Sequence, residues 1–157
     1  MLKALVFAIF LTPFISCTNE LKDEKRGLHV TYNGLEPKAI ELFADQVPKE
    51  SKTISFGQEL TVHFKGIDDF STTGEKKVLF GGEVSVIDSA NNVLFHVPDY
   101  FKKYDLNGVD QKDAETIKLN LIIGKPLLPG NTFRYLFRIW DKKSDKELKG
   151  NLEFEVI

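Results

Sequence analysis

Apolar and polar residues alternate along one short segment after another from Leu28 to the end of the chain. Because successive side chains of a β-strand point to opposite faces, this period of two predicts strands with one buried and one solvated face. The strongest patterns cover residues 28–32, 59–65, 83–88, 93–97, 116–123, 132–140 and 152–156, and weaker ones cover residues 38–43 and 52–56. Two other segments, 99–104 and 110–115, suggest single helical turns, the second with Asp110 at the N-cap position.

An amphipathic strand needs a second layer against which to bury its apolar face. The pattern therefore predicts an all-β fold, in which two antiparallel sheets form a β-sandwich of about seven to nine strands over residues 28–157. A small closed β-barrel would bury the same faces and stays open as an alternative. With 42% hydrophobic residues, the chain can fill the core of one domain.

The alternation also suggests how the last two strands pair. If they run antiparallel with their apolar faces matched, Tyr135 lies beside Phe154. In this register Arg134 faces Glu155 across the solvated side of the sheet. Such an exposed ion pair contributes at most about 1 kcal/mol, so it serves as a test of the register rather than a source of stability.

A short apolar run opens the chain and ends at its only cysteine. Lys3 precedes the apolar residues 4–11, and Pro13 then interrupts the run before Cys17. The stretch from residue 4 to residue 17 is shorter than the roughly 20 residues that a membrane-spanning helix needs. The sequence therefore predicts a targeting segment that is removed, not a permanent transmembrane helix.

Residues 14–17, Phe-Ile-Ser-Cys, resemble the lipobox of bacterial lipoproteins, in which a small residue precedes the cysteine that is lipidated and becomes the new N-terminus. Phe14 stands where that motif usually has Leu. The resemblance implies a lipoprotein signal peptide over residues 1–16 and a lipidated polar tether over residues 17–27. It also implies a bacterial outer-membrane location, facing the periplasm or the cell surface, while a plain signal peptide with an incidental cysteine is the alternative.

A second resemblance concerns the last third of the chain. Residues 128–141 place a Pro-Gly turn before a strand rich in aromatic residues, which an aspartate and a lysine-rich turn follow. This segment looks like the penultimate strand of immunoglobulin-like modules in bacterial surface lipoproteins, and residues 152–157 are similar to their last strand. The resemblance implies an immunoglobulin-like sandwich in an uncharacterised envelope lipoprotein family. It concerns architecture alone, because such modules serve many functions.

Residue patterns typical of catalytic or metal sites are missing from the sequence. With Cys17 lipidated, the domain has no thiol for a disulfide, a zinc site or a nucleophile. His29, His63 and His96 lie in separate strands without ligand-like spacing. We therefore expect no enzyme, no cofactor and no metal ion. One alternative stays open, a calcium ion held between end loops by some of Asp68, Asp69, Asp88 and Asp105.

Net charge excludes a further class of partner. The whole chain has a net charge of −2, and loss of residues 1–16 removes one basic residue and no acidic one. The remaining charge of −3 offers no basic field for nucleic acid. The expected partners are therefore the membrane, through lipid on Cys17, and a protein or glycan of the envelope.

Residues 132–140 also suggest a binding surface. Arg and Trp residues are enriched at the centres of binding interfaces, and a Trp ring can stack on a sugar or a peptide. We therefore predict Arg134, Arg138 and Trp140, on the outward face of this strand, as ligand-binding residues. The alternative is that neighbouring segments cover the Trp ring while the arginines pair with Glu153 and Glu155.

These observations predict a lipid-anchored binding or accessory module. The alternatives are a structural subunit that accepts a strand from a partner at a sheet edge, and, less favoured, a hydrolase. Each possibility predicts a different structure. A binding module shows an exposed Trp140 surface, a structural subunit leaves a long unpaired edge strand, and an enzyme has a deep pocket with convergent ionisable groups.

Overall fold

The computed structural model describes residues 19–157, so the predicted signal peptide and Cys17 lie outside the described residues. Nine of the described strands have five residues or more: β1 (Asn19–Asp23), β2 (Leu28–Asn33), β3 (Ala39–Ala44), β6 (Glu59–Lys65), β8 (Phe80–Asp88), β9 (Val93–Val97), β11 (Thr116–Ile122), β12 (Thr132–Asp141) and β13 (Glu147–Val156). The shorter elements are β4 (Val47–Pro48), β5 (Thr53–Ile54), β7 (Lys77–Val78), β10 (Val109–Asp110), the 3₁₀ turn η1 (Lys102–Tyr104) and the helix α1 (Gln111–Ala114).

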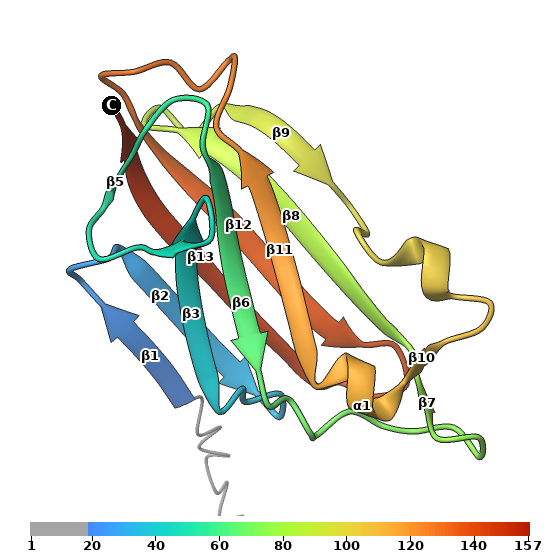
Figure 1. The fold of residues 1–157 in the computed structure, drawn as a ribbon. Coiled ribbons are helices and arrows are strands. Elements are labelled where there is room, and N and C mark those ends of the chain that lie inside the picture. The colour runs from blue at the N-terminus through green and yellow to red at the C-terminus, as the bar shows by residue number, and fades with distance from the viewer. Residues whose placement is uncertain (1–18) are drawn as a thin grey trace, which may run out of the picture.

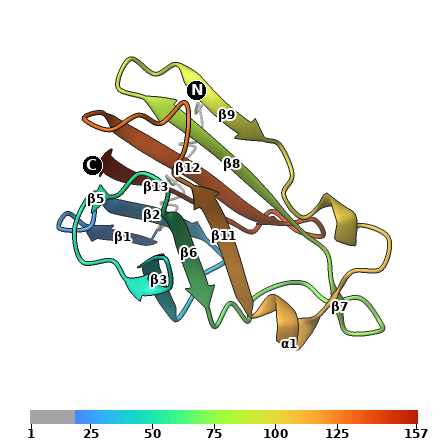
Figure 2. The ribbon, with the colours of Figure 1, turned by 45° about the horizontal axis from the view of Figure 1, so that its top comes forward.

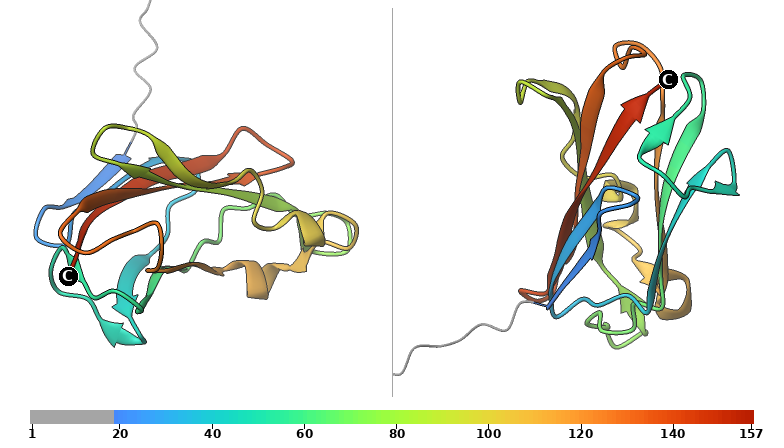
Figure 3. Two further views of the ribbon diagram at one scale, coloured as in Figure 1. Left: turned by 90° about the horizontal axis from the view of Figure 1, so that it is seen from above. Right: turned by 90° about the vertical axis from the view of Figure 1, so that its left-hand side faces the viewer.

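Two sheets lie face to face, as Figure 1 and Figure 3 show. The larger sheet has the strand order β1-β2-β13-β12-β8-β9, with β5 added in parallel to the end of β13. The smaller sheet has the order β11-β6-β3-β4, and β7 and β10 form a separate two-stranded ladder. The predicted all-β, largely antiparallel sandwich is confirmed. The alternative of a small barrel is wrong, because over residues 19–157 the two main sheets are separate and keep free edges.

The strong period-two patterns all form strands. Two of them begin earlier than predicted, β8 at Phe80 and β13 at Glu147. Both expected helical turns are also present, as η1 and α1. Asp110 occupies the N-cap position of α1, although its side chain makes no capping hydrogen bond.

The core lies between the inward rows of the two sheets. Phe64 of β6 packs edge-on against Phe137 of β12, with 5.4 Å between their ring centroids. Tyr135 is fully buried among these residues, and its hydroxyl has no hydrogen-bond partner within residues 19–157. Burial, with a smaller contribution from the phenol of Tyr100, raises the pKa of Tyr135.

The predicted register of β12 and β13 is wrong by two residues. Tyr135 pairs with Leu152, and Arg134 pairs with Glu153 instead of Glu155. The predicted faces are nevertheless right, because Arg134 and Glu155 both lie on the outer side of the sheet. A slip of two residues keeps every side chain on its face, so alternation alone does not distinguish these registers.

Residues 19–27 do not form the polar tether expected of them. Asn19–Asp23 is an edge strand that pairs antiparallel with β2, and residues 24–27 form the turn between the two strands. The turn ends at Gly27, whose positive φ of 76° favours glycine. Solvent reaches both faces of most of β1, so this strand has no apolar face and leaves no period-two pattern in the sequence.

Candidate functional site

The residues predicted to bind a ligand lie on the outer face of β12, where they alternate with buried neighbours. We call Arg134, Leu136, Arg138 and Trp140 the β12 outer row. All four side chains are half-buried, and Trp140 is not among the exposed large hydrophobic residues. The row is therefore present where the sequence placed it, without the exposed Trp140 surface expected of a binding module.

Trp140 rests on a glycine of the neighbouring strand. The two strands β12 and β8 pair so that Trp140 lies opposite Gly81. A Cβ atom at position 81 would lie only 2.2 Å from Cζ2 of Trp140, so the indole occupies the space of the missing side chain. Gly81 and Gly82 both lie within β8.

The arginines of the β12 outer row are also engaged. Cζ of Arg138 lies 4.9 Å from the centroid of the Trp140 ring, and its Nε donates a 2.6 Å hydrogen bond to Glu147. Arg134 donates to the side chain of Asn91. Glu153, one of the predicted acidic partners, instead pairs with Lys52 at 2.7 Å. The alternative of engaged arginines fits this geometry better, but Arg138 alone has an acidic partner, Glu147, and Arg134 is held by an amide.

Gly81→Ala is expected to displace the Trp140 ring. The substitution should lower the free energy of unfolding by about 1–3 kcal/mol, because the added methyl group overlaps the indole. It should also shift the fluorescence emission of Trp140, the only tryptophan. Denaturant unfolding and emission spectra measure both effects. Gly74→Ala is the matched control, since no atom lies within 4 Å of its Cβ position, and an unchanged spectrum for Gly81→Ala would contradict the packing described.

A serine and a histidine meet on the outer face of the larger sheet. Oγ of Ser85 lies 2.8 Å from Nδ1 of His96, across the β8–β9 pair. Glu83 lies 3.9 Å from the same nitrogen. A catalytic triad needs the carboxylate at the other imidazole nitrogen, where it orients the base. This trio lacks that geometry. It could not be predicted from the sequence, because only the register of β8 and β9 brings the residues together.

A hollow of about 500 Å³ lies on the outer face of the smaller sheet. His63 lies in it with its side chain 13% exposed and Nδ1 3.8 Å from Glu41. Burial, aided by Lys118 and Lys65, lowers the pKa of His63 below its usual value, so its imidazole is neutral at pH 7. Glu41 itself pairs with Lys65 at 2.7 Å. The lining residues are Glu41, Phe43, Gln46, Glu59, Thr61, His63, Lys65, Lys118 and Asn120.

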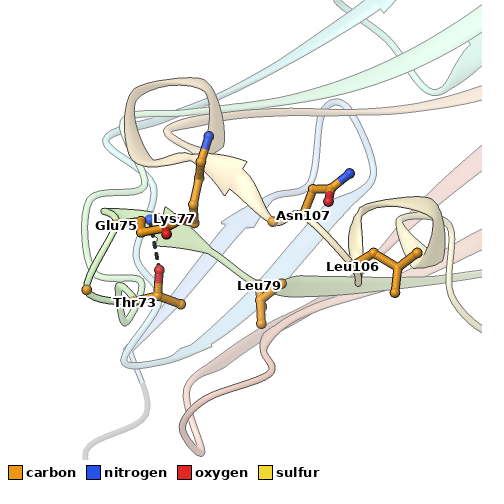
Figure 4. Close-up of a pocket in the computed structure, with 8 residues that line it drawn as sticks. Thr73, Glu75, Lys77, Leu79, Leu106 and Asn107 are labelled. Carbon is orange, nitrogen blue, oxygen red and sulfur yellow. Dashed lines mark hydrogen bonds between the residues drawn. The ribbon is translucent and has the colours of Figure 1, made fainter.

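A smaller hollow of about 300 Å³ lies beside β7 and the loop before β10. Figure 4 shows Glu75 and Lys77 on one side of it and Leu106 and Asn107 on the other. Nζ of Lys77 pairs with Asp110 at 2.9 Å, outside the lining. The hollow therefore offers no pair of ionisable groups that face each other across it.

The aspartates considered for calcium do not converge. Asp68 pairs with Lys38, and Asp105 pairs with Lys142. Asp88 accepts hydrogen bonds from the turn that follows β8, including one from Asn92. Among residues 19–157, no group of three or more His, Cys, Asp or Glu side chains is placed to hold a metal ion.

The larger sheet extends beyond the smaller one on one side. The contact of Phe64 with Phe137 places β6 over β12. In Figure 1, β3 lies on the side of β1 and β2, and β11 lies on the side of β8. β11 therefore lies over β8, and no strand of the smaller sheet lies over β9. Figure 2 shows β9 extending past the edge of the smaller sheet. The inner face of β9 therefore has no strand of the smaller sheet opposite it.

Apolar side chains lie on this part of the larger sheet. Phe95 and Val97 of β9 pair with the buried Val86 and Val84, which places them on the inner face of the larger sheet. Phe95 is 46% exposed, and Tyr100, just after β9, is 41% exposed. We call Phe95, Val97 and Tyr100 the open strip. The sequence predicted the strand β9 and did not predict this strip, which depends on the relative width of the two sheets.

Comparisons with known proteins assign no family or function to this chain. No helix within residues 19–157 has the length and apolar character to cross a bilayer. No protein-family model matches the chain, and no curated protein matches it significantly.

Proposed function

We propose that this chain is a lipid-anchored protein of the bacterial envelope and that its sandwich domain binds a partner protein as a binding or accessory module. The lipobox-like residues 14–17 support the anchor. A lipidated N-terminal cysteine with more than one acyl chain stays on a membrane, whereas a single chain binds only marginally. The immunoglobulin-like resemblance of the last third is consistent with such a module.

One observation carries the binding role, namely the open strip beside β11. Phe95 and the partly buried Val97 lie on the apolar inner face of the larger sheet, and Tyr100 follows just after β9. The other sandwich strands, by contrast, cover equivalent residues such as Val84 and Val86. Contiguous apolar surface of this kind marks interaction sites in soluble domains. A partner protein fits this site better than nucleic acid, because the strip is apolar and the charge of the chain after residue 16 is negative.

Phe95→Glu is expected to abolish partner binding. A carboxylate in the contact would lose its hydration without gaining a counter-charge, which disfavours the complex. We expect recovery of the partner with the detergent-extracted full chain to fall about tenfold or more, the equivalent of about 1.4 kcal/mol. Quantitative mass spectrometry of the purified complex measures the recovery.

Val47→Glu is the matched control. Val47 is 64% exposed on β4, at the opposite edge of the smaller sheet from β11. Its substitution adds the same charge away from the open strip and should leave recovery unchanged. Equal recovery with Phe95→Glu and with the wild type would contradict the proposed binding role of the strip.

A further inference from the structure

We infer that the partner supplies an extended segment that joins the smaller sheet as a fifth strand, beside β11 and over β9. This inference rests on the proposed function and names the mode of binding at the same site. It follows from three features of the structure: the direction of the free backbone groups of β11, the regularity of this edge, and the width of the overhang, by which we mean the part of the larger sheet that extends beyond β11.

The free backbone groups of β11 can be located from the end of the strand. The N–H of Ile123 donates to Gln58 at 2.9 Å, and the carbonyl of Ile123 accepts from Gly57 at 2.7 Å. Both groups of this residue therefore point toward the β6 side. Because direction alternates along a strand, the N–H and C=O groups of every second residue point to the free edge. These residues are Thr116, Lys118, Asn120 and Ile122.

A backbone hydrogen bond between β6 and the end of β3 shows the same alternation of backbone direction. The N–H of Asp45, just after β3, donates to the carbonyl of Glu59 at 2.9 Å. Glu59 therefore directs its carbonyl toward β3, as expected if Leu60 faces β11. Between residues 116 and 122, none of the backbone hydrogen bonds to turns, loops or caps of the described chain involves β11. Its outer groups are thus available to another strand.

The other sheet edges are less suited to pairing, and at β1 three of the five residues are charged. The β8–β9 pair has an irregular register between Val86 and Ile87, and Pro98 follows β9 directly. The edge at β4 is two residues long and contains Pro48. Natural proteins use bulges, prolines, charges and short strands to block pairing at edges. β11 has seven residues without proline, glycine or a bulge, and Lys118 is its only charged residue.

The overhang has room for one strand rather than for a second copy of this chain. Neighbouring strands lie about 4.8 Å apart, so a strand added to β11 falls over β9. Antiparallel pairing of β11 with its counterpart in a second copy would place β9 of each molecule where β8 of the other lies. The occupant that fits is therefore a single extended segment of another protein.

The surroundings also define the chemistry of that segment. Its inward side chains would meet Phe95 and Tyr100, which favours small or apolar residues at alternate positions. Its outward side chains would lie next to Lys118, where an acidic residue gains a cross-strand attraction. The segment is thus an alternating apolar and polar peptide with an acidic residue near its middle.

Amide hydrogen exchange tests this mode of binding directly. The probe is a synthetic peptide of about seven residues, the length of β11, with Val alternating with Thr and a central Glu. In the detergent-extracted full chain, the peptide should slow exchange at the outward amides of Lys118, Asn120 and Ile122 by about tenfold or more. The amides of Ile117, Leu119 and Leu121, which point to β6, should already exchange slowly and serve as an internal reference.

Asn120→Pro and Asn120→Thr form the matched pair of variants. Proline removes an N–H that points to the free edge, so the β11–β6 ladder keeps its hydrogen bonds. It should abolish both the peptide effect at Lys118 and the capture of the partner. Threonine keeps the N–H, loses the same Asn120 contact with Glu59, and should retain both.

The outcomes separate this inference from the proposed function. If Phe95→Glu loses the partner while Asn120→Pro keeps it, the partner contacts the open strip without adding a strand, and only this inference is wrong. If both variants keep the partner, both proposals are wrong. Absence of peptide protection, or cross-linking of Asn120→Cys to a second copy, would also overturn the inference.

Discussion

Replacing Cys17 with serine is expected to move the protein out of the membrane fraction or to block its processing. Serine lacks the thiol to which, by the lipobox resemblance, the lipid is attached, and its hydroxyl does not replace that thiol. Without acyl chains, the domain loses the stable anchor that more than one buried chain provides. Fractionation of cells and intact mass measurement of the N-terminus both report the effect, which should be close to complete.

Thr18→Ser is the matched control for this experiment, because it changes the next residue conservatively and leaves the cysteine in place. It should fractionate with the wild type. An unchanged membrane fraction and an unchanged N-terminal mass for Cys17→Ser would contradict the lipid anchor. The fold itself should be unaffected in either variant, since both positions precede Asn19, the first residue of β1.

Lys49→Met is expected to stabilise the domain at neutral pH. Lys49 lies between β4 and β5 and is only 4% exposed, and its ammonium group donates to the carbonyl of Ser51. The adjacent Glu50 pairs with Lys25 instead. Burial, with a contribution from Arg26, lowers the pKa of Lys49 from 10.5 to about 8. A shift of this size corresponds to a cost of about 3 kcal/mol for the charged form.

The pH dependence gives this prediction its signature. Between pH 8 and 10.5 the unfolded chain holds the lysine proton while the folded chain releases it, so the stability of the wild type rises with pH in this window. Below it the full cost applies, and Lys49→Met should raise the free energy of unfolding by about 1–3 kcal/mol. The difference should shrink as the pH rises toward 10.5.

Lys25→Met tests whether this gain belongs to the buried position. Its side chain is 73% exposed, so loss of its charge should change stability little at any pH. Denaturant unfolding at a series of pH values measures both variants. A destabilised Lys49→Met variant, or a gain that does not vary above pH 8, would show that burial does not penalise this charge.

The long strands could be predicted from the sequence because each has one buried and one solvated face. Residues such as Leu119 and Phe154 alternate with polar neighbours and are fully buried in the structure. β1 could not be found in this way, since edge position and backbone pairing stabilise it without an apolar face. The register of β12 and β13 depends on their connection, where Asp141 accepts hydrogen bonds from the backbone N–H of Lys143 and the hydroxyl of Ser144.

The candidate sites were predictable only as far as single strands determine them. The outward direction of Arg138 and Trp140 follows from alternation, and the structure has both on the outer face. That Trp140 lies on Gly81 requires the pairing of two strands far apart in the chain. The open strip requires still more, namely the order of strands in both sheets and their alignment across the core.

The start of β1 limits how far the domain can move if Cys17 carries lipid. Only Thr18 separates that cysteine from Asn19, and two residues span at most roughly 7 Å. The domain would then rotate about its anchor as one body at the bilayer surface, without a flexible linker that would let it move away from the membrane. Its encounters would be confined to partners in the same thin layer, where a high effective concentration allows weak contacts to persist.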